Sequence, residues 1–289
     1  FSAASTLSTD GGEIALQGRL DTRSEAYGIE LRCDSFPLNR FLPADSLGLI
    51  DLALQAGGSG FDPLRAQTRG NIRLQVDRAE FRGRDFGGVK LNANLEGGQL
   101  SGRLSDRDEA LRLLLLISGT LTERKQEVRL TGNVFDFDLA ELGISPQKIG
   151  GSFALEAGAS ASDAGSYTAR IALDSIEVRT RHRTDRIRPT SLSLSSDTTA
   201  TRAKLASGDL SLAFVSPGPV DSLVPALTRS TDILAQQIRA QSVDMETLKP
   251  ALPDFSLSVT AGRENILNNF LKSFSWASIK INFATIVIT

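Results

Sequence analysis

The sequence predicts a mainly β protein, built as one long antiparallel meander with a short helical insertion. Apolar and polar residues alternate along many short runs, glycine pairs separate several of these runs, and the alternation is lost in only a few places. The 289 residues are 40% hydrophobic and 23% charged, so the chain can bury a substantial core and does not have the composition of a disordered chain.

The alternation is clearest at residues 71–77, where Ile72, Leu74 and Val76 share one face and polar residues occupy the other. A strand with one apolar and one wet face is typical of antiparallel sheets. The same pattern predicts strands at 27–33, 89–95, 171–173, 192–194, 210–214, 257–259 and 279–283. The longest wholly apolar run, 113–117, suits a buried strand.

Turn and bulge positions can also be read from the sequence. We expect turns between strands at the glycine pairs, where positive φ is often required. In two places the apolar set shifts by one residue, at Asp174-Ser175 and at Val134-Phe135, and each is a candidate bulge or turn because such a shift exchanges the two faces. The pairs are Gly11-Gly12, Gly57-Gly58, Gly87-Gly88, Gly97-Gly98 and Gly150-Gly151.

The alternation divides the chain into three parts of one continuous domain. Residues 1–215 form a β-repeat sheet, 216–253 a helical insertion, and 254–289 a resumed sheet that contains an amphipathic helix at 264–275. A helical turn is expected at 37–43, between two prolines.

The insertion has the signals of a helix. Asp221-Ser222 can cap its start, and Pro225 suits a first turn. Leu227, Leu234 and Ile238 would share one helical face, and Pro250 and Pro253 would end the segment.

Common catalytic templates are missing from the sequence, and we expect no enzyme and no cofactor. His182 is the single histidine and lies between arginines. A chain with one histidine cannot form a metal cluster that needs several histidines. Cys33 is the single cysteine, so the chain cannot form an internal disulfide. Because Cys33 shares an apolar face with Ile29 and Leu31, we expect it to be a buried, unreactive thiol. No phosphate-binding loop of the GxxxxGK type occurs.

Two charged clusters have a functional and a plain interpretation. Asp106, Asp108 and Glu109 could hold calcium, but they lack the spacing of a calcium loop, so a solvated turn is favoured. The arginine-rich run 179–188 could bind an anionic headgroup or partner, and a solvated hairpin is favoured over that reading. The net charge of −2 argues against nucleic acid as a partner, and no apolar stretch is long enough to cross a bilayer.

One stretch is more specific than composition. Residues 33–43 read CDSFPLNRFLP and are followed by GLI at 48–50, a glycine-rich GGSG at 57–60 and FD at 61–62. Together with LASGDL at 205–210 and the helical segment after Phe214, this pattern resembles the TamB-like proteins of the AsmA-like group, in the version found in Bacteroides-type bacteria.

The resemblance implies a cell-envelope scaffold. Such proteins are anchored in the inner membrane by an N-terminal helix and span the periplasm with a sheet curled into a half-pipe (β-taco-like) that has an apolar inner face. They are implicated in phospholipid transport to the outer membrane and, as translocation and assembly modules, in outer-membrane biogenesis with an outer-membrane barrel protein. This chain starts at Phe1 without methionine, so we expect an internal fragment whose anchor and barrel-binding parts lie outside it. The family supplies no catalytic residue.

We therefore expect a scaffold that conducts phospholipid acyl chains, or assists outer-membrane protein assembly, through an apolar β-groove. A one-sided sheet of this length needs a cover for its apolar face, which could be a second layer, its own curl or a ligand. The alternatives are a closed sandwich core, and with it a structural or adhesive envelope β-protein that binds other proteins. The predicted groove-lining residues are Ile72, Leu74, Val76, Leu91, Leu95, Ile171, Leu173, Leu192 and Leu194.

Overall fold

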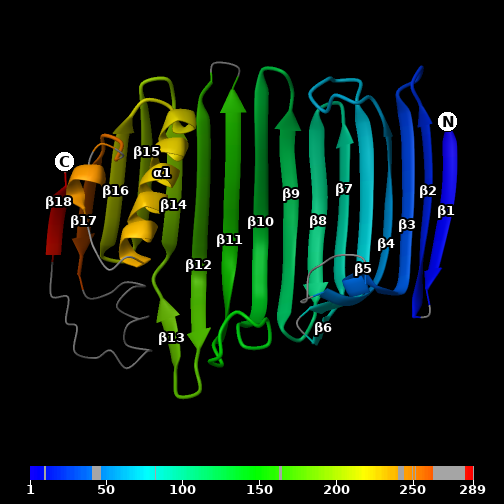
Figure 1. Cartoon of the computed structure of the whole chain (residues 1–289), viewed down its shortest axis with the longest axis horizontal. Coiled ribbons are helices and arrows are strands. Elements are labelled where there is room, and N and C mark those ends of the chain that lie inside the picture. Colours follow the sequence, from blue (N-terminus) through cyan, green and yellow to red (C-terminus); the bar gives the residue numbers. More distant parts are fainter. Residues whose placement is uncertain are drawn as a thin grey trace. The chain divides into compact units, whose positions relative to one another are not determined.

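A computed structural model describes residues 1–9, 11–40, 47–81, 83–162, 165–239, 244–248, 250, 252–262 and 284–288. The chain is mainly β: a long open antiparallel sheet with one long helix (Figure 1). This confirms the fold class predicted from period-two alternation.

The strands follow one another along the chain as a meander. They are β1 Ser2–Thr9, β2 Gly12–Asp21, β3 Ala26–Pro37, β4 Leu47–Ser59, β5 Arg69–Phe81, β6 Arg84–Phe86, β7 Val89–Glu96, β8 Gln99–Arg107, β9 Leu111–Leu121, β10 Lys125–Asp138, β11 Gly150–Ser162, β12 Tyr167–Arg179, β13 Thr184–Ile187, β14 Thr190–Ser196, β15 Ala200–Ser207, β16 Leu210–Pro217, β17 Ser256–Ala261 and β18 Ala284–Ile288. Short β6 and β13 sit beside the main series, because β5 also pairs with β7 and β12 also pairs with β14.

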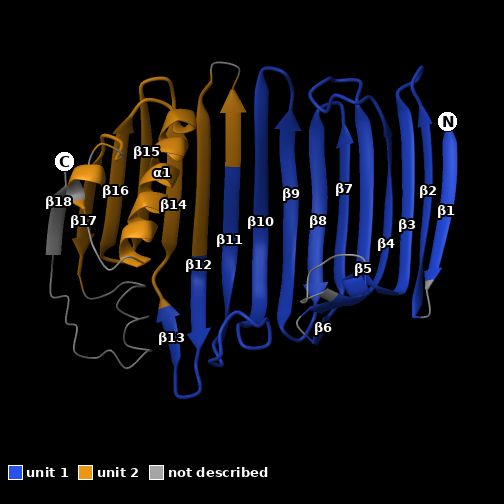
Figure 2. Ribbon diagram, in the orientation of Figure 1, with its two compact units in different colours: residues 1–158, 174–186 blue, residues 159–173, 187–289 orange. Residues whose placement is uncertain are grey.

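The chain divides into two compact units (Figure 2). Unit 1 comprises residues 1–158 and 174–186, and unit 2 comprises residues 159–173 and 187–289, so β11, β12 and the last residue of β13 fall across the boundary. Each unit is described separately below.

The helices are η1 Leu38–Arg40, a single 3-10 turn, and α1 Val220–Arg239 and α2 Met245–Leu248. The helical turn expected at 37–43 corresponds to η1 over its described part, and α1 and α2 fall inside the expected insertion. The amphipathic helix expected at 264–275 lies outside the described residues. No helix in the described part of the chain is both long and apolar enough to cross a membrane.

The predicted apolar face of α1 was wrong in detail. Its buried residues are Leu223 and Ser230, whereas Ile238 is 62% exposed. Helical periodicity alone admits several neighbouring stripes, and the one that packs is selected by where the helix is anchored. Pro225 lies inside the helix rather than in its first turn.

Two glycine pairs do not lie between strands as predicted. Gly57-Gly58 is inside β4, and Gly150-Gly151 opens β11. At Gly58 the reason is close approach: a Cβ there would collide with the Arg69 carbonyl oxygen and lie 2.8 Å from the Tyr27 hydroxyl, and one at Gly70 would lie 3.2 Å from the same hydroxyl. Glycine inside a strand marks such close packing as often as it marks a turn.

Both predicted phase breaks are irregular positions. The pairing of β9 and β10 shifts register between Val134 and Asp136, and Val134 is buried while Phe135 is 49% exposed. Ser175 has a φ of 51°, in the left-handed region. A further bulge that was not predicted separates Cys33 from Phe36 in the pairing of β3 and β4, where Ser35 has a φ of 48°.

Candidate functional site

The register of unit 1 aligns leucines into a row across the strands. Leu74 of β5 lies directly opposite Leu54 of β4 on one side and Leu91 of β7 on the other. Because directly opposite residues of an antiparallel pair point to the same face, the row lies on one face of the sheet. It runs through Leu16, Leu31, Leu54, Leu74, Leu91, Leu104 and Leu115.

The five lining residues predicted in this unit fall on that same face. Leu74 faces Leu91, Ile72 faces Ala93, Val76 faces Val89, and Leu95 faces Gly70. The alternation therefore identified members of one surface correctly. It did not identify Leu16, Leu31, Leu54, Leu104 or Leu115, because only the register shows that these extend the same row.

The apolar face of unit 1 is largely uncovered by the described residues. Ile72 is 44% exposed, Ile29 44% and Leu16 45%, and Leu74 and Leu91 are only half-buried. Leu115, at the end of the row, is buried. In a closed sandwich core such central residues would lose nearly all of their exposure to an opposing layer. These exposures fit an open apolar surface better than a closed core.

A hollow of about 880 Å³ lies in unit 1, and its lining is mixed, with nearly equal polar and apolar parts. Most of its lining comes from the face opposite the leucine row, as shown by Gln17, Glu30 and Gln55, which are in register with one another on β2, β3 and β4, although Ile29 and Leu95 of the leucine face also border it. Gly28 and Gly57, also directly opposite each other, contribute bare backbone. Arg69 and Glu96 form an ion pair at 3.6 Å on its margin. The charged groups in this lining make it a poorer surface for a hydrocarbon chain than the leucine row.

The four lining residues predicted in unit 2 also share a face. Ile171 lies directly opposite Leu192, Leu173 opposite Thr190, and Leu194 opposite Ala169. Ile171 is 42% exposed and Leu192 44% exposed. The helix α1 packs on β15 in this unit.

The acidic cluster has a structural role in the geometry observed. The Asp108 carboxylate accepts hydrogen bonds from the backbone N–H groups of Gly87, at 2.9 Å, and Ala110, at 2.8 Å, and Asp106 accepts one from Asp108 N–H. Burial raises the pKa of Asp106 above its ordinary value. No group of three or more metal-binding side chains is found within the described ranges.

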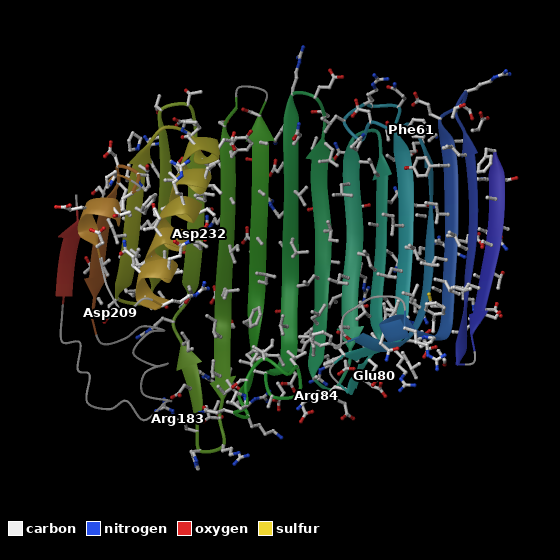
Figure 3. The ribbon with its side chains drawn as sticks, viewed as in Figure 1. Phe61, Glu80, Arg84, Arg183, Asp209 and Asp232 are labelled. Atoms are coloured by element: carbon white, nitrogen blue, oxygen red, sulfur yellow. The ribbon has the colours of Figure 1, made fainter. Side chains whose placement is uncertain are left out.

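The arginine-rich run forms the hairpin of β12 and β13 at one end of unit 1. Arg183, labelled in Figure 3, pairs with Asp185 at 2.7 Å, and Arg179 pairs with Asp136 of β10. His182 is exposed in the turn between the two strands. This geometry agrees with the favoured interpretation of a solvated hairpin.

Cys33 lies in β3 beside the bulge and is 4% exposed. Burial, followed by the charges of Asp34 and Asp51, raises the pKa of its thiol. Less of it is therefore thiolate near neutral pH than for a free cysteine, as expected of an unreactive buried thiol.

Comparison with known proteins adds no further assignment: no family model, curated protein or solved structure matches this chain. The candidate functional site therefore rests on the geometry of the molecule, and it is the uncovered apolar face of unit 1.

Proposed function

We propose that this chain is a non-enzymatic scaffold that binds and conducts phospholipid acyl chains along the apolar face of unit 1. The observation that carries the proposal is the row of leucines on seven adjacent strands, of which only Leu115 is buried. Exposed apolar surfaces of this extent mark sites for a partner or ligand.

The dimensions of the row suit an acyl chain. Seven strands at about 4.8 Å spacing give a row roughly 29 Å long. The chains of one bilayer leaflet span about 15 Å, half of the hydrocarbon thickness. The row can therefore hold a complete acyl chain lying across the strands.

The energetics favour passage over storage. Burying an acyl chain of about 16 methylenes yields about 13 kcal/mol, at about 0.8 kcal/mol for each methylene. Leaving the bilayer costs about the same, and an open face covers only one side of the chain, so roughly half of that cost is recovered. The chain is therefore held less tightly on this face than in the membrane, which favours rapid exchange.

The resemblance of residues 33–62 and 205–210 to TamB-like proteins supports placing this function in the periplasm of the cell envelope. In that setting the chain is a segment of an inner-membrane-anchored protein that carries phospholipid toward the outer membrane. Assistance to outer-membrane protein assembly, with a barrel protein as partner, follows from the same resemblance and depends on parts outside this segment.

The proposal is tested by native mass spectrometry of the purified chain, with identification of the lipid that co-purifies. We expect bound phospholipid in the wild type. Leu74→Asp and Leu91→Asp should each abolish it, because a carboxylate in the row cannot be desolvated by a hydrocarbon chain.

The matched control is Asn92→Asp, which places the same carboxylate beside Leu91 on the opposite, polar face. It should retain lipid. A wild type that is lipid-free even after incubation with phospholipid vesicles would overturn the proposal, as would a folded Leu74→Asp variant with undiminished lipid. Circular dichroism of each variant separates lost binding from lost folding.

A further inference from the structure

The segment that contains α1 is an excursion from the hairpin of β16 and β17. The last residues of the pair in register are Val215 and Ser256, and the Ser216 hydroxyl donates a hydrogen bond to the Asp254 carbonyl at 2.7 Å. The chain therefore leaves the sheet and returns to it at nearly the same place. The stacking of Phe214 on Phe255, with centroids 5.6 Å apart, closes this end of the hairpin.

Three hydrogen bonds fix the start of α1 to unit 2. The Val220 N–H donates to the Ser196 hydroxyl at 2.8 Å, the Thr201 hydroxyl donates to the Gly218 carbonyl at 3.0 Å, and the Gly218 N–H donates to the Thr199 carbonyl at 2.8 Å. Ser196 and Thr201 are directly opposite each other in β14 and β15, and both are almost fully buried.

These anchors place α1 on the apolar face. Ser196 shares its face with Leu192 and Leu194, and Thr201 shares its face with Ala203 and Leu205, because alternate residues of a strand point the same way. The residues of β15 on the other face, Arg202 and Lys204, are exposed, as they would not be beneath a helix. Figure 1 shows α1 crossing β14 and β15.

The hold of α1 on this face weakens along its length. On the stripe that packs, Leu223 is 6% exposed and Ser230 5%, whereas Ile233 and Gln237, further along the same stripe, are only half-buried. The face next to it stays open: Ile171 and Leu192 are neighbours in register and both are more than 40% exposed. The same cross-strand row continues from Leu192 to Leu205 of β15, and β15 is the strand on which α1 packs.

We propose that the apolar face of unit 2 is a second acyl-binding surface. The helix α1 covers part of this surface in the absence of ligand, and an acyl chain can displace it. This inference rests on the proposed function and extends it. An acyl chain binds first to Ile171 and Leu192 and extends along the row toward Leu205. It displaces the weakly held C-terminal half of α1, while the three N-terminal hydrogen bonds keep the helix attached. Unit 1 has no such occupant among its described residues and binds without this competition.

The test is photo-crosslinking with diazirine-labelled palmitic acid, followed by mapping of the labelled peptides. In one variant an Asn-Gly turn replaces residues 218–253 and links Pro217 to Asp254. A two-residue turn of this type closes antiparallel hairpins, and the ends already lie together. If the surface beneath α1 is free in about a tenth of molecules, removal of α1 raises labelling of β14 and β15 about tenfold at low probe concentration. Labelling of β5 and β7 should not change.

A pair of point variants supports the test if the deletion variant does not fold. Ser196→Ala and Thr201→Val each remove an anchor of α1 and should increase labelling of β14 and β15. They should also speed amide hydrogen exchange within α1. Ser195→Ala, on the same strand but facing the other way, is the matched control and should do neither.

The outcomes separate the two proposals. Labelling of β5 and β7 with no gain at β14 and β15 in any folded variant overturns the second surface and leaves the function of unit 1 standing. Labelling of neither unit overturns both. Exchange within α1 that saturating palmitic acid does not change, despite labelled β14 and β15, overturns the displacement of α1.

Discussion

At the scale of single residues, Asp197 organises the turn between β14 and β15. Its carboxylate accepts hydrogen bonds from the backbone N–H groups of Thr199, at 2.7 Å, and Ala200, at 3.0 Å, and from the Thr199 hydroxyl. All three bonds favour the ionised form. The Thr199 hydroxyl is the largest cause, and together they lower the pKa of Asp197 from 3.8 to about 2.

This pKa shift makes the stability of the turn depend on pH. A carboxyl group whose pKa is lower in the folded state stabilises the fold above its unfolded pKa, and that contribution is lost as pH falls from 3.8 to about 2. We expect carbon-detected NMR titration of Asp197 to show a midpoint near 2. Thr199→Val, which removes the hydroxyl donor, should raise that midpoint. In urea unfolding, Asp197→Asn should differ from wild type more at pH 6 than at pH 2. A wild-type midpoint at the ordinary value would contradict this assignment.

The side chain of Tyr27 shows how one residue can explain several others. Its hydroxyl oxygen lies where side chains at Gly58 and Gly70 would otherwise be, and its ring stacks on Phe61 with centroids 6.2 Å apart. Figure 3 labels Phe61. Gly58, which the sequence predicted to lie in a turn, is thus a packing position, and only the cross-strand register of Tyr27 with Gly58 reveals this.

At the scale of elements, the strands are regular except at a few defined irregularities. Two of these, at Val134-Phe135 and at Ser175, coincide with the phase shifts in the sequence, because a bulge must displace the apolar set by one residue. The bulge at Ser35 has the same signature, since the apolar set moves from Leu31 and Cys33 to Phe36, but it was not among the predicted positions. There the Asp51 carboxylate accepts hydrogen bonds from both the N–H and the hydroxyl of Ser35, which are contacts between β3 and β4.

The φ of 51° at Ser175 predicts the effect of glycine there. A non-glycine residue in this region costs about 1–2 kcal/mol, while glycine loses about 0.5–1 kcal/mol through its greater freedom in the unfolded chain. We expect Ser175→Gly to stabilise the protein by about 0.5–1 kcal/mol in chemical denaturation. The control is Ser193→Gly, at an exposed position of regular β14, which should destabilise by a similar amount. Equal loss in both variants would show that the left-handed backbone at Ser175 is unstrained.

At the scale of the whole molecule, the balance between buried and exposed apolar surface is unusual. Only ten apolar side chains are buried among the described residues, while large apolar side chains such as Leu16, Ile29 and Ile72 are exposed on one face of unit 1. The net charge of −2 offers little repulsion between copies of the chain.

We therefore expect the lipid-free chain to self-associate through the apolar face of unit 1. Sedimentation velocity should show assembly that grows with protein concentration and is reversed by palmitic acid, which competes for the same face. Leu74→Asp together with Leu91→Asp should give a monomer without added lipid. Assembly that persists unchanged in this double variant would locate the self-associating surface elsewhere, because the two carboxylates face each other in the centre of the row.

The sequence by itself determined which residues share a face of each strand, that the fold is a long antiparallel meander, and where a helical segment interrupts it. These features follow from local periodicity, which can be read from the sequence of each strand separately. The tertiary structure alone decided that leucines of seven strands form one row, that the described residues leave this row largely uncovered, and that α1 lies on the apolar face of unit 2. Those features depend on register and on contacts between residues far apart in the chain, such as Ser196 with Val220. Local sequence patterns do not predict such contacts.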